Sequence, residues 1–289
     1  MKLSTALRLG RVSNLPTVIT NVLAGCMLSS TEFSLPVYAG LCAAMTLAYV
    51  GGMYLNDAFD REYDARFRPE RPIPSGEVSA QRVFGLGFAM LGAAALTVVL
   101  IAVRGSGGST LAAGSSMLAL ASTIVFYDLY HKQNRLSPVV MGACRVLVYL
   151  TAGLTIASWP PSGPLGWGCA ALLGYLIGLS YAAKQENFGE VKNVWPLLCL
   201  ALPFASAIWV RDAVSGGLLL VFAAWTLYSL SWLMRREQRN IPRAIGHFIA
   251  GISLLDASLI ALVGAPGLGV LCVAGFALTL ALQRVVPGT

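Results

Sequence analysis

Charged side chains are scarce in this chain of 289 residues. They make up 11% of the sequence, whereas hydrophobic residues make up 56%, and the mean hydropathy is +0.71. This composition excludes an ordinary soluble globular domain. Long apolar runs must satisfy their backbone hydrogen bonds internally in lipid, and runs of this length are too long for barrel strands. The sequence therefore predicts an all-α, polytopic membrane protein.

Nine or ten stretches of the sequence are long enough to cross a hydrocarbon layer of ~30 Å. The last two are the least regular, because Arg243 and His247 enter one and Arg284 ends the other. We therefore expect a bundle of about nine transmembrane helices. The predicted spans are residues 14–31, 35–56, 80–103, 109–130, 137–157, 164–184, 194–211, 215–234, 243–263 and 267–285.

Cysteine and histidine are few and dispersed. The six cysteines are scattered among the predicted spans without a CxxC pair, and His131 and His247 have no metal-ligand spacing. This pattern argues against a disulfide framework and against a zinc site, and it is typical of cysteines that pack as small apolar residues. We also expect no cleavable signal peptide, so the first apolar run should remain as a span.

The net charge of +7 is concentrated in every second connection between spans. Basic residues precede the first predicted span and follow the second, fourth, sixth and eighth, whereas the other connections carry little charge. By the positive-inside rule, the N-terminus and these basic loops are cytoplasmic. We expect an integral protein of the bacterial inner (plasma) membrane, in contact with membrane lipid, and no nucleic-acid partner.

The most informative polar segment is NDAFDREYD, which follows the second predicted span. It places oxygen-bearing side chains at Asn56, Asp57, Asp60 and Asp64. If the preceding helix continues for two turns, the three aspartates lie at i, i+3 and i+7 and share one face. Clustered carboxylates require a cation, and oxygen ligands without His or Cys favour Mg²⁺. The alternative is a solvated face beside the membrane.

Residues 57–82 form the longest polar segment. Three prolines within RPERPIPSG prevent a continuous helix and predict an ordered cap, with a new helix beginning near Ser79. A second polar interval, KQENFGEVKN at 184–193, follows the sixth span. We therefore predict a single domain over 1–289 with two similar halves, about 1–130 and 137–260.

The segment NDAFDREYD followed by RPERPIPSG resembles the first signature, NDxxDxxxD with a trailing RPxPSG, of the UbiA family of membrane prenyltransferases. The polar entry RVSNLP and the segment from Tyr127 to Lys132 agree with that resemblance. The stretch around LYHKQNRLSP and the second loop without Asp look more like the divergent EboC-like subgroup.

The resemblance implies a central cavity in which Mg²⁺ holds the diphosphate of an isoprenyl donor. The implied metal ligands are Asn56, Asp57, Asp60 and Asp64. The implied catalytic residues are Asp57, Asp60, Asp64 and Arg145. The expected diphosphate contacts, on the same cytoplasmic side, are Asn14, Arg71, Lys132 and Lys184, with Arg11 as a further candidate.

The second polar interval departs from the family pattern, because it contains no Asp where two or three are usual. Glu186 and Glu190 stand at i and i+4 and would share a face of a continued helix, so one prediction makes them metal ligands. The alternative is that Lys184 and Lys192 pair directly with phosphate. A site of that second kind would depend less on a second metal.

Arg145 and Asp256 are charged residues well inside predicted spans. An unpaired guanidinium such as that of Arg145 costs at least ~2.5 kcal/mol in the membrane, so we expect it to face the cavity. There it binds an anionic donor or acceptor, or it pairs with an acid such as Asp128 or Asp256. Asp256 has two interpretations, a site role or an interhelical hydrogen bond.

The leading hypothesis is an Mg²⁺-dependent prenyltransferase that moves a polyprenyl group from an isoprenyl diphosphate to an aromatic or other lipophilic acceptor. The alternative is a non-catalytic or transport-related relative that binds an isoprenoid or lipid-linked metabolite, which the altered second motif favours. A secondary transporter unrelated to prenyl transfer is a third hypothesis.

Overall fold

The structure is a computed structural model. It describes residues 1–30, 34–105, 107–132, 134, 136–157, 159–185, 195–234 and 240–286, and the backbone only of residues 184, 185 and 195. Within these ranges all regular structure is helical and no strand occurs. Eight of the described helices are long and apolar enough to span a membrane. The all-α prediction is confirmed, and the chain is an integral membrane protein.

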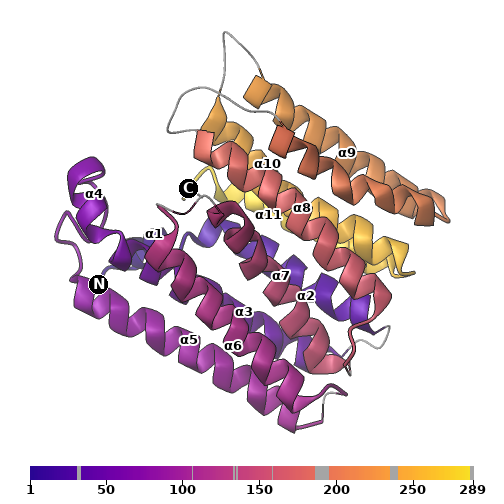
Figure 1. Ribbon diagram of the computed structural model, residues 1–289, viewed down its shortest axis with the longest axis horizontal. Helices are drawn as coiled ribbons and strands as arrows, with labels where there is room; N and C mark the ends of the chain where they lie inside the picture. The colour runs from indigo at the N-terminus through magenta and orange to yellow at the C-terminus, as the bar shows by residue number, and fades with distance from the viewer. Residues whose placement is uncertain are drawn as a thin grey trace.

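Figure 1 shows the described helices packed side by side as one bundle. They are α1 (Leu3–Leu9), η1 (Val12–Asn14), α2 (Leu15–Ser29), α3 (Leu35–Phe59), α4 (Arg61–Phe67), α5 (Ala80–Val103), α6 (Thr110–Tyr130), α7 (Ser137–Ile156), α8 (Gly163–Gln185), η3 (Trp195–Trp209), α9 (Ala213–Met234), α10 (Ile241–Leu262) and α11 (Pro266–Leu282).

The predicted spans correspond to these helices, with two shorter than expected. The predicted span 194–211 is the 3₁₀-helix η3, which has 15 residues and contains Pro203. A 3₁₀-helix rises about 2.0 Å per residue, so η3 still extends about 30 Å. The predicted span 267–285 is α11, which has 17 residues. The expectation of about nine spans is therefore close to the observed eight long and two shorter apolar helices.

The two larger clusters of the apolar interior meet at α2 and α7. One buried cluster combines residues of α3, α5 and α6, and the other combines residues of α8 to α11 and η3. Both clusters also include residues of α2 and α7. In α2 and α10, 78% of the spanning window is buried, more than in the other long helices. Polar side chains on α2 and α10 are therefore internal to the protein.

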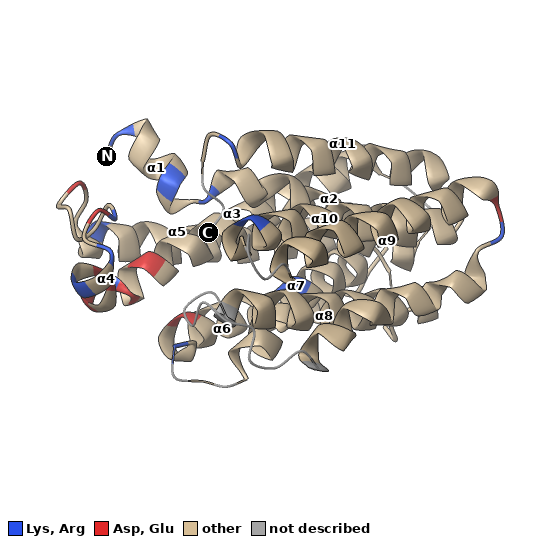
Figure 2. Cartoon of the chain, turned by 90° about the horizontal axis from the view of Figure 1, so that it is seen from above, with Lys and Arg blue, Asp and Glu red and all other residues tan. Residues whose placement is uncertain are grey.

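Charge is concentrated at one end of the bundle. Figure 2 shows most of the basic and acidic residues around α1, α4 and the neighbouring ends of α3 and α6, with few at the end that holds the loop between η3 and α9. At the charged end, Arg8 donates to Glu77 at 2.6 Å and Thr5 donates to the same carboxylate at 2.6 Å. These contacts fasten α1 to the proline-containing loop, so residues 57–82 form the ordered cap that the prolines predict.

Close packing of α2 against α7 depends on glycine. A Cβ atom at Gly25 would lie 2.6 Å from the carbonyl oxygen of Tyr149, whereas a Cβ at Gly92 of α5 would meet nothing within 4 Å. We expect Gly25→Leu to lower the free energy of unfolding by about 1–3 kcal/mol. Gly92→Leu is the matched control. The measurement is the melting temperature of each purified variant in one detergent, and equal values for the two would contradict this packing.

Candidate active site

The acidic segment does not continue as one straight helix. Asp60 ends α3 and precedes α4, so it stands at the junction of the two helices. The helix that the prediction of a shared face required, continuous for two turns beyond Asn56, is therefore interrupted at Asp60. Asp57 and Asp64 both pair with Arg71, whereas Asp60 pairs with Lys132.

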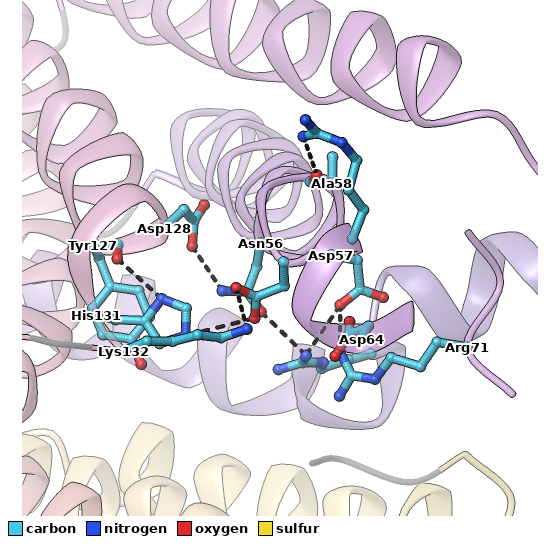
Figure 3. Close-up of polar contacts among 12 residues, drawn as sticks. Asn56, Asp57, Ala58, Asp64, Arg71, Tyr127, Asp128, His131 and Lys132 are labelled. Atoms are coloured by element: carbon cyan, nitrogen blue, oxygen red, sulfur yellow. Dashed lines mark hydrogen bonds and ion pairs between the residues drawn. The ribbon is translucent and has the colours of Figure 1, made fainter. Parts of the chain in front are cut away.

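Arg71 joins Asp57 and Asp64. Its Nη1 atom lies 2.9 Å from Oδ1 of Asp57 and 3.3 Å from Oδ2 of Asp64, and Figure 3 shows both carboxylates facing the guanidinium. The side chain of Asp64 is only 3% exposed. Burial raises the pKa of its carboxyl above the ordinary value, and the positive charge of Arg71 opposes that rise. Arg71 thus holds the proline loop against the acidic cluster, close to where its motif position predicts.

Arg11 supplies a second guanidinium to the cluster. It has a left-handed backbone conformation, with φ of 42°, between α1 and η1. One of its nitrogens, Nη2, lies 3.3 Å from Oδ1 of Asn56 and 3.3 Å from Oδ1 of Asp57. The amide oxygen and the carboxylate oxygen therefore converge on one positive group.

Asp60 pairs with the end of α6. Nζ of Lys132 lies 2.8 Å from Oδ1 of Asp60, and Nε2 of His131 lies 3.6 Å from Oδ2. The ammonium also lies 3.5 Å from the ring centroid of Tyr63, a cation–π contact. Burial lowers the pKa of His131, an effect that Asp60 opposes. Lys132 is thus beside the acidic segment, whereas the sequence assigned no role to His131.

Asp128 lies beside the cluster, although the sequence did not predict it as a site residue. Its Oδ1 accepts a hydrogen bond of 3.0 Å from Nδ2 of Asn56, and the residue is 4% exposed. Its Oδ2 is buried and has no hydrogen-bond partner within the described part of the chain. The sequence feature that could have indicated Asp128 is an acidic residue in the last turn of a predicted apolar helix, where the helix dipole disfavours negative charge.

Arg145 belongs to a separate polar network inside the bundle. Its guanidinium donates to Oδ1 of Asn21 at 2.9 Å and to Oγ1 of Thr17 at 3.0 Å. Asn21 in turn donates to Oδ2 of Asp256 at 2.9 Å, and the hydroxyl of Tyr149 also donates to Asp256. Arg145 therefore meets Asp256 through an amide rather than directly. Thr17 and Asn21 stand at i and i+4 on α2, a polar stripe that could have indicated this network.

Asn14 adjoins the Arg145 network, because its carbonyl oxygen accepts a hydrogen bond of 2.7 Å from Oγ1 of Thr17. Asn14 is 5% exposed, and its Oδ1 accepts a hydrogen bond of 3.4 Å from Nε2 of Gln283 in α11. Lys184 lies in the last turn of α8, and its side chain is outside the described atoms. Glu186, Glu190 and Lys192 lie outside the described residues altogether. The prediction for the second polar interval therefore stays a prediction.

The cluster has the chemistry of a hard-cation site, with basic side chains placed among the ligands. Within the described ranges, no three acidic, His or Cys side chains form a group that could hold a metal ion. Two pairs of oxygens nevertheless converge, one on Arg11 and one on Arg71. Carboxylate and amide oxygens are ligands that suit Mg²⁺. A divalent cation would thus compete with a guanidinium for these oxygens.

Together, the fold and the charged end define a membrane-embedded helical bundle with an oxygen-rich, cation-lined site at one end. Residues 18–252 match the family described as the UbiA prenyltransferase family. Because this match covers most of the chain, the protein belongs to that family.

Two curated relatives resemble parts of the chain. Protoheme IX farnesyltransferase 1 of Cenarchaeum symbiosum is 31% identical over 166 residues, which are 56% of this chain and 51% of the relative. Digeranylgeranylglyceryl phosphate synthase of Methanopyrus kandleri is 40% identical over 87 residues, which are 29% of this chain and 30% of the relative. The chain thus spans about half the length of the first relative and about a third of the second.

Two solved structures share the fold over most of the chain. A UbiA homolog from Archaeoglobus fulgidus, solved with GPP and Mg²⁺ bound, has a TM-score of 0.63 and 16% identity, covering 95% of this chain and 99% of that one. An apo UbiA homolog from Aeropyrum pernix K1 has a TM-score of 0.62 and 17% identity, covering 87% and 97%. At these identities the likeness concerns the fold.

The contact between Arg71 and Asp64 leads to a pH-dependent prediction. Arg71→Gln leaves Asp64 buried without its counter-ion, and we expect a loss of about 1–3 kcal/mol in unfolding free energy near neutral pH. Without Arg71 the pKa of Asp64 rises further, so the folded state takes up a proton more readily than the unfolded state.

The stability gap between wild type and Arg71→Gln should therefore be largest near pH 8 and shrink as the pH falls through the raised pKa. Melting curves across this range measure the gap. Arg66→Gln, a change of an exposed arginine in α4, is the control. A gap that widens on acidification would refute the pairing.

Proposed function

We propose that this protein is an Mg²⁺-dependent prenyltransferase, which moves a polyprenyl group from an isoprenyl diphosphate to an aromatic or other lipophilic acceptor. The observation that carries this proposal is the set of oxygens of Asn56, Asp57 and Asp64 that converge on Arg11 and Arg71. Family membership supports it. So do the names of the relatives, which are prenyl-transferring enzymes, and the neighbour solved with GPP and Mg²⁺.

A site with both acidic and basic side chains suits a diphosphate with its bound cation better than a site with only acidic or only basic side chains would. A diphosphate carries several negative charges, which Arg11, Arg71 and Lys132 would bind through charge-assisted hydrogen bonds. Asn56, Asp57, Asp60 and Asp64 would hold Mg²⁺. When bound, that ion would neutralise charge that develops on the leaving diphosphate.

The chemical step breaks the bond between C1 of the prenyl chain and the diphosphate oxygen, and the electron pair leaves with the diphosphate. A nucleophilic atom of the acceptor forms the new bond to C1 and then loses a proton. Basic side chains fixed near the departing oxygen stabilise charge that increases in the transition state. Lys132 is held by Asp60 at 2.8 Å, and Arg71 by Asp57 at 2.9 Å, so these groups are already oriented.

The membrane setting fits a donor with a long apolar chain. The charged end of the bundle adjoins helices that are apolar along their length (Figure 2). The diphosphate would therefore lie at the charged end, and the isoprenoid tail would lie along the apolar helices. By the distribution of Lys and Arg, the charged end faces the cytoplasm. The membrane we infer is the bacterial plasma membrane.

The first test is binding of a donor. Purified protein should bind farnesyl or geranylgeranyl diphosphate in the presence of Mg²⁺, as measured by isothermal titration calorimetry. Asp57→Ala and Asp60→Ala should each abolish that binding, whereas Asp212→Asn, at the start of α9, should not. Unchanged binding in both site variants would refute the metal-site assignment.

Arg145 calls for a separate test because it lies in a different network from the aspartates. We expect Arg145→Gln to reduce turnover by at least about tenfold, since it removes a preorganised cationic donor. A parallel loss of donor affinity would assign Arg145 to the diphosphate, and unchanged donor affinity would assign it to the acceptor. Unchanged turnover and binding would leave the guanidinium with a structural role only, contrary to the proposal.

The second candidate function is binding or movement of an isoprenoid or lipid-linked metabolite without catalysis. The observation that favours it is the absence of Asp from residues 184–193. The two functions predict the same binding of donor. They differ in whether the bound donor is consumed, which a turnover measurement decides.

A further inference from the structure

Asn56 is held in one orientation by Asp128. Its Nδ2 donates to Oδ1 of Asp128 at 3.0 Å, and its Oδ1 lies 3.3 Å from the same Arg11 nitrogen as Oδ1 of Asp57. A carboxylate accepts hydrogen bonds and cannot donate them, so it selects the NH₂ side of the amide. The side-chain oxygen of Asn56 therefore faces the side where Asp57 lies.

Asp128 is a buried acid, one oxygen of which is unpartnered among the residues that the structure describes. The residue is 4% exposed and stands in the last turn of α6. Within the described residues it has no ion pair, and its Oδ2 has no hydrogen-bond partner. A neutral acceptor in this position would satisfy Nδ2 of Asn56 at a lower desolvation cost. A buried carboxylate with one free oxygen is better explained by a cation that binds next to it.

We propose that Asp128 is a positioning residue of the divalent-cation site, which fixes the side-chain oxygen of Asn56 toward the cation. Figure 3 shows Asp128 on the far side of Asn56 from Asp57 and Arg71. Partners of this kind orient the atoms that bind a metal and raise their affinity for it. The inference rests on the proposed function, because it concerns the same metal site.

The test measures Mg²⁺ affinity without turnover. Geranyl thiolodiphosphate, an unreactive donor analogue, is titrated into purified protein at graded Mg²⁺ concentrations, and the Mg²⁺ concentration that gives half-maximal binding is recorded. Asp128→Leu should raise this concentration about 10–100-fold, the range typical for loss of such partners. Binding at saturating Mg²⁺ should return to the wild-type level, which damage to the fold would not allow.

A double-mutant cycle tests whether Asp128 changes the Mg²⁺ affinity through Asn56. If Asp128 acts through Asn56, Asp128→Leu should cause no further loss in an Asn56→Ala background. A full loss in that background would mean that Asp128 acts independently of Asn56, and it would overturn the positioning role. If Asp128→Leu does not fold, Asp128→Asn serves instead, because its neutral amide removes the charge and permits either orientation of Asn56.

Two results separate this inference from the proposed function. Mg²⁺-dependent binding in wild type with an unaltered Mg²⁺ requirement in Asp128→Leu and Asp128→Asn would overturn the role of Asp128 alone. Binding that needs no Mg²⁺ in wild type would overturn both. Asp128→Glu, which keeps the charge and the acceptor, should restore much of the affinity, and Asp212→Asn controls for loss of an acid elsewhere.

Discussion

The arrangement of the charged end depends on the ion pair between Asp57 and Arg71. Asp57 is in the last turns of α3, and Arg71 is in the proline-containing loop, so the pair with its 2.9 Å contact ties the loop back onto the helix. Asp64 joins through the same guanidinium. Carboxylates this close to the membrane are costly without a counter-ion. The same requirement explains why a site of four oxygen-bearing residues is surrounded by Arg11, Arg71 and Lys132.

Charges inside the bundle are also compensated, but through an amide and not by a direct ion pair. Arg145 and Asp256 carry opposite charges, but Asn21 stands between them and donates to the acid while it accepts from the base. Asp256 is fully buried on α10. Arg145 of α7 donates to Thr17 and Asn21 of the largely buried α2, so both charges lie inside the protein. An amide bridge preserves the orientation of the guanidinium without direct neutralisation by the carboxylate. Such an arrangement suits a cation that has to interact with an anionic group of a substrate.

Much of the fold and part of the site could be predicted from the sequence. The spans follow from hydropathy, and the placement of Arg71 near the aspartates follows from the spacing of the motif. The ion pair of Asp60 with Lys132 could not be predicted, because Lys132 is distant in sequence and becomes adjacent only after α3 and α6 pack. The contact of Asn56 with Asp128 depends on the same packing. Sequence patterns indicate which side chains share one helix, whereas pairs between helices require the bundle itself.

The central claim is that the protein transfers a prenyl group and does not only bind one. The most direct measurement uses purified protein in lipid, deuterated farnesyl and geranylgeranyl diphosphates, and a total lipid extract as the source of acceptor, with products followed by mass spectrometry. The account predicts a lipid that carries the labelled prenyl group and equimolar release of diphosphate. Both should require Mg²⁺ and disappear in Asp57→Ala. A donor that binds in the presence of Mg²⁺ and remains intact would contradict the account.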